Sequence, residues 1–366
     1  MSGALVDLVA KGVQDAYLTG NPEVSFFRQK YSRHTNFASK PVRLNYIGVP
    51  AGGADLTLKI PNKGDLLSYI WIDLGSTSVS TAFGSETANP AEFELYIGGQ
   101  LIDRQDATFV SQVWHKCLAD SQAKVNSATR LSGVVSSYGA SNWFPLHFFF
   151  CDKLYLPLVA LAYHEVELRI KFTSTCSPPS DLKVYANYVL LDTNERQSIV
   201  DTDHNLLIEQ VQKIYSEQSG TASNKFDLSL LNHPVKALVW SNCVPGNTFT
   251  TDEVQLYLNG TEVFDDRMPD IFFRQVTSYY NTDHNATNGV DGVGGVGSGN
   301  NIKMYPFALK VNKLQPTGTC NFSRLDTAEL ALGTITAPPS TSIPLYAVNY
   351  NVLRIKKGMA GLAFSN

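Results

Sequence analysis

The sequence has little charge for its length. Only 17% of its 366 residues are Asp, Glu, Lys or Arg, while 43% are hydrophobic and 11% aromatic. Because ordinary globular chains carry about 25% charged residues, we expect less solvated surface here and more surface covered by partners. The formal charge is −4 and the pI is about 6.0. This argues against direct binding of nucleic acid, since such domains usually have a high pI.

Cysteine is also scarce. The five cysteines are Cys117, Cys151, Cys176, Cys243 and Cys320, and no Cys-x-x-Cys occurs. An odd number at wide spacing signals neither a disulfide framework nor a zinc site, so we expect free thiols in a reducing compartment. No apolar run reaches the ~18 residues of a membrane span. Asp7 and Lys11 interrupt the N-terminal apolar residues, so no signal peptide is predicted and we expect synthesis in the cytosol.

Motifs of common enzymes are missing. There is no Gly-x-Ser-x-Gly and no Gly-Lys dipeptide, so neither a hydrolase elbow nor a P-loop is indicated. Gly292, Gly294 and Gly297 spell Gly-x-Gly-x-x-Gly. A dinucleotide site needs a strand before that motif and a helix after it, whereas here a polar segment precedes it and no helix is predicted to follow. We therefore predict no cofactor.

Residue types that bind metals are scattered. The histidines form no His-x-His pair and stand at His34, His115, His147, His164, His204, His233 and His284. His164–Leu168 begins like a zinc-protease motif, but it lacks the second histidine and lies in a predicted strand, where ligands cannot share a helical face. The acids of Asp201–Asp203 (with His204 beside them) and Asp265–Asp266 fit turns better than a metal site. We predict no metal site and no enzyme.

What the sequence does contain is an internal repeat. Three segments of the first half recur in the second: Phe93–Gly99 as Val254–Gly260, Phe144–Leu146 as Tyr305–Phe307, and Leu168–Lys171, letter for letter, as Leu353–Lys356. The first two are offset by 161 residues and the third by 185, which predicts extra residues late in the second copy. Such a period is too long for a solenoid and has the size of a domain. We predict two tandem copies of one fold, with Leu168 and Leu353 at equivalent core positions.

Most of the chain is predicted to be β-structure. Residues 3–18 carry apolar side chains at helical spacing and end at Thr19–Pro22, which predicts one short helical arm. From residue 24 onward β-branched and aromatic residues dominate. His164–Phe172 alternates strictly between apolar and charged residues, while Leu66–Leu74 and Val235–Trp240 fit inner strands. Short strands without alternating helices predict antiparallel sandwiches.

Two irregular segments divide the sequence. Asp192–Gln212 fits a linker with a helical turn, and the glycine-rich residues 289–299, within Asn281–Asn301, fit a surface loop. We predict an arm at 1–25 and domains at 26–198 and 199–366. Five basic residues without an intervening acid lie between positions 28 and 43: Arg28, Lys30, Arg33, Lys40 and Arg43. They fit either a solvated face or contact with an acidic neighbour, such as a lipid headgroup or another subunit.

Several ordered segments together resemble one protein family. The opening residues Gln14–Pro22, with Phe26–Phe27 and Arg33–Phe37 after them, resemble the start of major capsid proteins of nucleocytoplasmic large DNA viruses, of the phycodnavirus and iridovirus type. Further similar segments are Leu206–Gln210, Leu231–Lys236, Gln315–Arg324, Asn349–Ile355 and Gly361–Asn366.

The resemblance implies a fold, an assembly and partners. The fold is all-β, a double jelly roll of two tandem eight-stranded antiparallel sandwiches behind the helical arm. Three chains form a pseudo-hexagonal trimer, and such capsomers tile an icosahedral shell over an internal membrane. Three copies of a doubled chain offer six similar lateral faces. Neighbouring capsomers, minor capsid proteins and the membrane are then the partners, with no direct contact to nucleic acid and with assembly in the host cytoplasm.

The arm and the basic segment are the predicted assembly residues on the inner side. They are Leu5, Leu8, Val9, Tyr17, Asn21, Pro22, Arg28, Lys30 and Arg33. Two alternatives remain open: a paralogous capsid protein at a minor or special lattice position, and a jelly-roll surface protein that binds glycans through Tyr279 and Tyr280. Of the three Asn-x-Ser/Thr sequons, at Asn259, Asn285 and Asn321, Asn285 is the candidate glycan site because it lies in the predicted loop.

Overall fold

The computed structural model describes residues 3–85, 89–121, 123–124, 142–152, 154–216, 224–241, 250–251, 253–282, 302–333, 335–336 and 343–364. They belong to two units, Met1–Asn36 and Phe37–Asn366, which we treat separately. The glycine-rich residues 289–299 and the sequon residue Asn285 lie outside the described residues.

The N-terminal unit contains three short helical segments instead of the single helix predicted over residues 3–18. They are α1 (Gly3–Val9), the 3₁₀ turn η1 (Val13–Asp15) and α2 (Ala16–Thr19). Helix α1 ends at Val9, and η1 begins after Gly12, whose backbone is extended and whose N–H donates to Asp15 Oδ2 at 2.6 Å. Glycine has a low helix propensity, and this Asp15 contact favours a new start over continuation of α1. The predicted stop is confirmed, but β-structure begins at Phe37 and not near residue 24.

The first half of the body contains two five-stranded sheets. In one, the order is β1-β10-β4-β7, with β8 also paired to β4; in the other it is β2-β3-β9-β5-β6. The strands are β1 (Phe37–Leu44), β2 (Tyr46–Ile47), β3 (Asp55–Ile60), β4 (Leu66–Gly75), β5 (Glu92–Ile97), β6 (Gln100–Asp106), β7 (Asn142–Pro145), β8 (Leu156–Pro157), β9 (Val166–Lys171) and β10 (Lys183–Leu191). The helical segments are α3 (Val79–Phe83), the π-helical η2 (Phe109–Leu118) and η3 (Leu158–Ala160).

The second half follows after helix α5 (Thr193–Asp201). One sheet has the order β11-β22-β13-β18, with β19 on β13 and β23 on β22; a second has β12-β20-β15-β16, with β17 on β15; β14 pairs with β21. The strands are β11 (His204–Tyr215), β12 (Asn224–Asp227), β13 (Pro234–Ser241), β14 (Thr250–Thr251), β15 (Glu253–Leu258), β16 (Thr261–Glu262), β17 (Met268–Pro269), β18 (Ile302–Pro306), β19 (Cys320–Asn321), β20 (Ala328–Leu332), β21 (Ile335–Thr336), β22 (Pro344–Lys356) and β23 (Met359–Leu362). The helical segments are η4 (Leu228–Leu230), the π-helical η5 (Phe272–Val276), α6 (Thr277–Asn281) and η6 (Phe322–Arg324).

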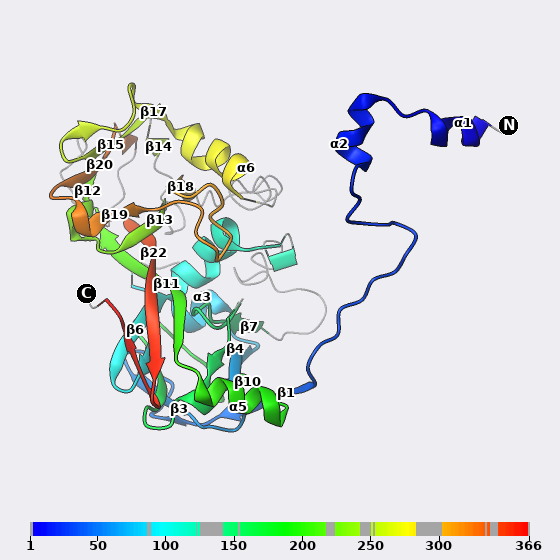
Figure 1. The fold of residues 1–366 in the computed structure, drawn as a ribbon. Coiled ribbons are helices and arrows are strands. Elements are labelled where there is room, and N and C mark those ends of the chain that lie inside the picture. The colour runs from blue at the N-terminus through cyan, green and yellow to red at the C-terminus, as the bar shows by residue number, and fades with distance from the viewer. Residues whose placement is uncertain are drawn as a thin grey trace. The chain divides into compact units, whose positions relative to one another are not determined.

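The two halves share one topology, as the repeat predicted. The order β1-β10-β4-β7 corresponds to β11-β22-β13-β18, and β3-β9-β5-β6 corresponds to β12-β20-β15-β16. A π-helical segment follows β6 in the first half and β17 in the second, and each precedes the strand at the far edge of its sheet. These helical segments were not predicted. The body is a double jelly roll with antiparallel strands (Figure 1).

One predicted equivalence is wrong. Strand β9 lies between β3 and β5, whereas β22 lies between β11 and β13. Leu95 pairs with Leu168 in the first half, and Leu256 pairs with Leu330 in the second, so Leu330 is the counterpart of Leu168. Leu353 is fully buried, as is Leu168, but it belongs to a different strand of the jelly roll. The offset therefore stays near 161, and the extra residues inferred from an offset of 185 do not exist.

Individual strands follow the predicted patterns. In β9, Val166, Leu168 and Ile170 are buried while the charged residues between them are half-buried. Strands β4 and β13 cover the two predicted inner segments. The predicted linker is a nine-residue helix, α5, and its apolar end is the start of β11. The domain boundaries at 25/26 and 198/199 stay predictions.

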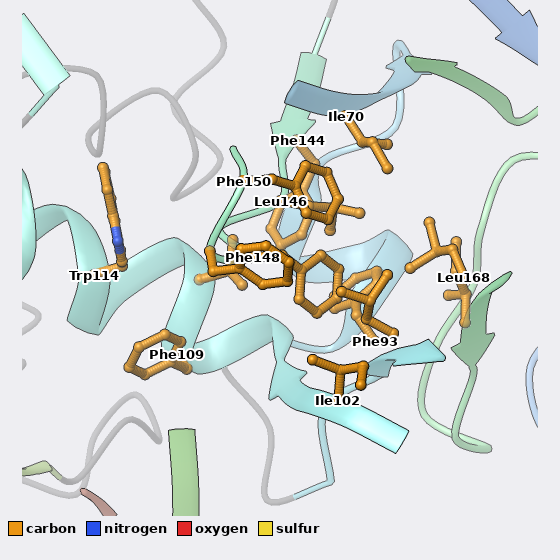
Figure 2. Packing of buried hydrophobic residues seen from close by; sticks show 14 of the residues in the cluster. Ile70, Phe93, Ile102, Phe109, Trp114, Phe144, Leu146, Phe148, Phe150 and Leu168 are labelled. Atoms are coloured by element: carbon orange, nitrogen blue, oxygen red, sulfur yellow. The ribbon is translucent and has the colours of Figure 1, made fainter. Parts of the chain in front are cut away.

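The buried apolar residues form two clusters. One fills the second jelly roll and includes Phe226, Trp240 and Phe273. The other fills the first jelly roll (Figure 2) and continues without a break onto one face of the β11-β22-β13-β18 sheet, through residues such as Val239 and Val348. Strands β13 and β22 of that sheet are therefore buried on both faces, whereas β4 of the counterpart sheet alternates between buried and more exposed residues.

Candidate functional site

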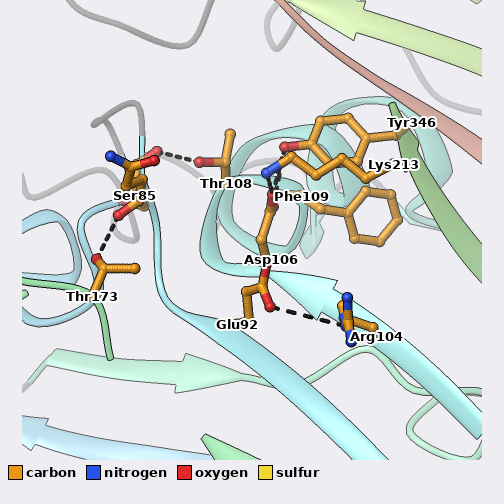
Figure 3. A network of polar contacts seen from close by, with 10 residues as sticks. Ser85, Glu92, Arg104, Asp106, Thr108, Phe109, Thr173, Lys213 and Tyr346 are labelled. Atoms are coloured by element: carbon orange, nitrogen blue, oxygen red, sulfur yellow. Dashed lines mark hydrogen bonds and ion pairs between the residues drawn. The ribbon is translucent and has the colours of Figure 1, made fainter. Parts of the chain in front are cut away.

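The junction between the two jelly rolls is a buried polar and apolar contact. Asp106, at the end of β6, accepts hydrogen bonds from the Tyr346 hydroxyl, at 2.8 and 3.1 Å, and pairs with Lys213 Nζ at 2.6 Å (Figure 3). It also accepts from the Phe109 N–H at 2.6 Å, which fixes the start of η2. Burial lowers the pKa of Lys213, but attraction to the Asp106 carboxylate outweighs it and raises that pKa above its usual value.

The Asp103 carboxylate also joins β6 to β11. Asp103 accepts hydrogen bonds from Val211 N–H at 3.0 Å and from Gln105 Nε2 at 2.8 Å. Gln210 donates to the Ile102 carbonyl. Burial raises the pKa of Asp103 to about 7, although these donors favour its charged form. Strand β6 of the first half is thus fixed to β11 of the second by side chains more than 100 residues apart in sequence.

The junction also holds two histidines, His115 and His147, which no sequence pattern pairs. His147 stacks on Trp114, with ring centroids 3.5 Å apart, and lies 5.1 Å from His115. Burial lowers the pKa of His115 to about 4 and that of His147 well below its usual value, so both rings are neutral near pH 7. The described residues contain no group of three or more histidines, cysteines or acids that could hold a metal.

One face of the first jelly roll is open. We call the outward side of β1-β10-β4-β7, with Tyr69, Trp71, Trp143 and Tyr185, the open face. Trp71 and Tyr185 stack with centroids 4.6 Å apart, and Tyr69, Trp71 and Trp143 line a shallow hollow. Tyr69 is 45% exposed and Trp143 is 42% exposed. Aromatic side chains of this kind are enriched at protein interfaces.

A second apolar surface lies on the second jelly roll. We call the segment formed by β16, residues 263–271, η5 and α6 the docking ridge. Its exposed apolar side chains are Val263, Ile271, Val276, Tyr279 and Tyr280. Tyr279, which is 75% exposed, contacts Tyr280 edge to face at 4.9 Å.

The predicted assembly residues all lie in the N-terminal unit, which buries none of its described helical residues. Leu5, Leu8, Val9 and Tyr17 are exposed within the chain, Asn21 adopts a left-handed backbone, and Lys30 Nζ donates to the Glu23 carbonyl at 3.4 Å. The role of these residues, and of Pro22, Arg28 and Arg33, in assembly stays a prediction.

Four other residues of the histidine, acid and asparagine motifs make contacts within the chain. Ala360 N–H donates to His164 Nδ1 at 3.1 Å, which ties the two halves together. Asp203 pairs with Lys356 at 2.9 Å. The side-chain oxygens of Asn259 and Asn321 accept backbone hydrogen bonds in turns, from Asp326 and from the residue two positions on. Among the described residues, no helix has the length and apolar character to span a membrane.

Comparisons with known proteins identify the family of the chain. One family model, described as the N-terminus of the major capsid protein, matches residues 25–192, and another, the major capsid protein of large eukaryotic DNA viruses, matches 244–361. The major capsid proteins of Pyramimonas orientalis virus and Paramecium bursaria Chlorella virus 1 are 34% and 32% identical, and each alignment covers all of both chains. Those alignments span 406 and 458 positions, so both relatives carry insertions that this chain lacks.

Comparison with solved structures leads to the same family. A crystal structure of VP54 from PBCV-1, fitted into a reconstruction of the virophage Sputnik, superimposes with a TM-score of 0.75 at 29% identity, covering 93% of this chain and all of that one. The Faustovirus major capsid protein, at 11% identity and a TM-score of 0.63 over 96% of both chains, shares the fold. The chain belongs to the family of major capsid proteins of large eukaryotic DNA viruses and is a structural protein of the viral capsid.

Proposed function

We propose that three copies of this chain form a pseudo-hexagonal capsomer, and that such trimers tile an icosahedral shell. The observation that supports this most is the matching topology of the two jelly rolls. Three doubled chains present six similar modules around a ring, so a three-fold assembly fits a six-sided lattice. The chain acts by burying surface and carries out no reaction.

The N-terminal arm and the basic segment after it face the interior of the shell in this proposal. Their partners there are minor capsid proteins and an internal membrane, and assembly takes place in the host cytoplasm. The exposed apolar side chains of α1 and α2 support this, because helices so short are marginal in water unless they dock on a partner. Five basic residues without an acid between them suit an acidic neighbour such as a lipid headgroup.

Deletion of residues 1–25 tests the role of the arm. The shortened chain is expected to remain trimeric in sedimentation velocity at nanomolar concentration and to fail in assembly of shells seen by electron microscopy. A matched control replaces Tyr163, an exposed tyrosine of the body, with serine and is expected to leave both trimer and assembly unchanged. Normal shells from the shortened chain would overturn the arm's role, and a monomeric wild-type chain would overturn the capsomer.

The two alternatives have their own tests. A reconstruction of the particle distinguishes the main lattice position from a minor or special one. A glycan array probed with the purified protein tests glycan binding by Tyr279 and Tyr280, which are exposed in the chain; the candidate glycosylation site Asn285 is tested by intact mass.

A further inference from the structure

Two histidines are packed against η2, the π-helical segment that contacts the second jelly roll. His115 belongs to η2, is 2% exposed, and its Nδ1 donates to the Lys124 carbonyl at 3.1 Å. The ring of His147 lies 8° from parallel to that of Trp114, with ring centroids 3.5 Å apart. Trp114 also belongs to η2, so both imidazoles are part of the packing that holds this helical segment in place.

Each ring has a buried nitrogen without a hydrogen-bond partner. Within the described part of the chain, neither His115 Nε2 nor His147 Nε2 meets a donor or an acceptor. Because the Lys124 carbonyl can only accept, Nδ1 carries the proton of the neutral His115 ring, and Nε2 is the nitrogen that a second proton would join. The new N–H group would then be buried, charged and without an acceptor, which is costly in a protein interior.

The surrounding charges make a proton on either ring more unfavourable. The charged groups of the described residues around the pair are already in ion pairs, which are Lys124 with Asp120 and Asp152, and Lys236 with Glu209. Burial lowers the pKa of both histidines, and the positive charge of Lys124 lowers it further. The second imidazole, 5.1 Å from the first, would add another positive charge. These effects together favour two neutral rings.

The segment η2 carries much of the apolar contact between the two jelly rolls. Phe109 of η2 packs against Tyr346 of β22, with ring centroids 5.4 Å apart, and Val113 of η2 belongs to the same buried cluster as Val348 of β22. A π-helical segment is rare in proteins and occurs often at functional sites. A positive charge placed against η2 therefore acts on an element that joins the first jelly roll to the second.

We propose that His115 and His147 form an acid switch, which keeps η2 on the second jelly roll while both rings are neutral and releases it when they take up protons below about pH 5. In the released state water reaches both rings, so they bind protons near the ordinary value of about 6.5, and acid favours that state. Each ring takes one proton from water, and no other reactant is needed. A shell built from such chains holds at neutral pH and loosens inside each subunit in acid.

The Asp103 carboxyl responds to acid in the opposite direction. Because burial raises its pKa to about 7, a proton on Asp103 favours the folded chain as the pH falls. Asp103 belongs to β6, whereas the two histidines pack against η2. A measurement of overall unfolding adds these opposing effects, but amide exchange resolves them segment by segment.

Hydrogen–deuterium exchange of the full-length protein, read by mass spectrometry at pH 7.5 and pH 5, tests the switch. After correction for the intrinsic pH dependence of exchange, we expect η2 to exchange about 30-fold faster at pH 5, which is the factor for one histidine whose pKa rises from about 4 to about 6.5 on release. Strand β9 of the same jelly roll is expected to keep its rate. No acceleration in η2, or an equal acceleration in β9, would contradict a local switch.

Matched variants identify the two rings. His115→Asn keeps an N–H group where Nδ1 donates to the Lys124 carbonyl, and His147→Phe keeps an aromatic ring against Trp114. The double variant is expected to protect η2 at pH 7.5 as well as wild type does, and to show no faster exchange at pH 5. The control His204→Asn changes a half-buried histidine of β11 and is expected to keep the wild-type response to acid.

A double variant that responds to acid as strongly as wild type would contradict the switch. If the double variant does not fold at pH 7.5, the two single variants replace it. Each is expected to show less than half of the wild-type acceleration in η2, and a full response in both would again contradict the switch. The readout lies within one chain, so a monomeric protein would contradict the capsomer and leave this test unchanged.

Discussion

Strands β1 and β11 hold the same place in their sheets and differ in what surrounds them. Each is an edge strand, β1 beside β10 and β11 beside β22. Seven of the eight residues of β1 are not buried, and six of these are largely exposed. In β11, by contrast, the Val211 N–H donates to Asp103 of β6 and Lys213 pairs with Asp106 of β6. When two copies of one fold meet through one junction, each copy uses only one of two surfaces. The corresponding surface on the other copy has no partner within the chain. The different exposure of β1 and β11 therefore follows from their positions in the chain, because the two jelly rolls have the same topology.

The largest effect is expected at the buried ion pair of the internal junction. Asp106→Ala removes the partner of Lys213, two hydrogen bonds from Tyr346 and the acceptor for Phe109 N–H. Breaking a buried pair in this way costs about 3–5 kcal/mol of unfolding free energy. Urea unfolding at fixed protein concentration measures it.

The matched control is Asp181→Ala in the first jelly roll. Asp181 pairs with Arg43 at 3.7 Å and with Lys183 at 3.0 Å, but its side chain is 71% exposed. Exposed pairs contribute about 0–1 kcal/mol. Equal losses from Asp106→Ala and Asp181→Ala would show that the junction is no more buried than the open face.

Core truncations test the corrected equivalence of the halves. Leu168→Ala and Leu330→Ala remove fully buried side chains from corresponding strands. Each is expected to lower the free energy of unfolding by about 2–5 kcal/mol, as burial at such sites usually gives, and so is Leu353→Ala at its own site. Denaturant melts that leave any of the three within 0.5 kcal/mol of wild type, roughly the range of surface substitutions, would contradict its place in a core.

The pH dependence of stability sharpens the description of the junction. Burial raises the pKa of Asp103 to about 7, so between about pH 4 and pH 7 the folded chain holds a proton that the unfolded chain releases. Stability therefore falls as pH rises through that window and levels off above it. The Asn side chain of Asp103→Asn does not titrate. The free energy of unfolding of this variant minus that of wild type is therefore expected to increase from pH 5 to pH 7.5 in urea melts.

His115 and His147 act in the opposite direction. Burial lowers their pKa values, so the unfolded chain binds protons more readily below about pH 6.5 and stability falls as pH falls there. They are present in both proteins, and the difference between the variant and wild type isolates Asp103. A difference that does not change with pH would show that Asp103 stays ionised.

The smallest effect compares the two hairpin turns. Gly98 and Asn259 hold equivalent positions, with φ of 57° and 49°. A Cβ atom at Gly98 would lie 2.3 Å from His164 Nδ1, whereas none of the described atoms lies within 4 Å of one at Gly99. Gly98→Asn is expected to lower the melting temperature by more than Gly99→Asn or Asn259→Gly, with a loss of about 1–3 kcal/mol, in the range of overpacking. Equal shifts in thermal melts would mean that His164 moves away freely.

Local patterns in the sequence predicted much of the fold. The alternation in β9 and the apolar runs of β4 and β13 identify strands because side-chain period is a local property. The 161-residue repeat was reliable because the matching segments sit in equivalent strands. The four-letter match at Leu168 and Leu353 predicted a wrong equivalence. Strands of similar composition recur in any sandwich, and only the hydrogen-bond register shows which strands correspond.

The surfaces could not be predicted in the same way. Asp106, Lys213 and Tyr346 are far apart in the sequence, and nothing local indicates that they meet. The π-helical η2 lies in the part of the chain, from residue 24 onward, whose β-branched and aromatic residues predicted strands. Gly12 interrupted an apolar pattern that was otherwise helical. The basic residues Lys40 and Arg43 of β1 are visible in the sequence, but the contacts of its counterpart β11 with β6 are not.

Single-particle electron microscopy of the purified oligomer tests the central claim most directly. The account predicts three copies around a three-fold axis, whose six jelly rolls give the capsomer a six-sided outline. A map of a single copy, or of two copies related by a two-fold axis, would contradict it.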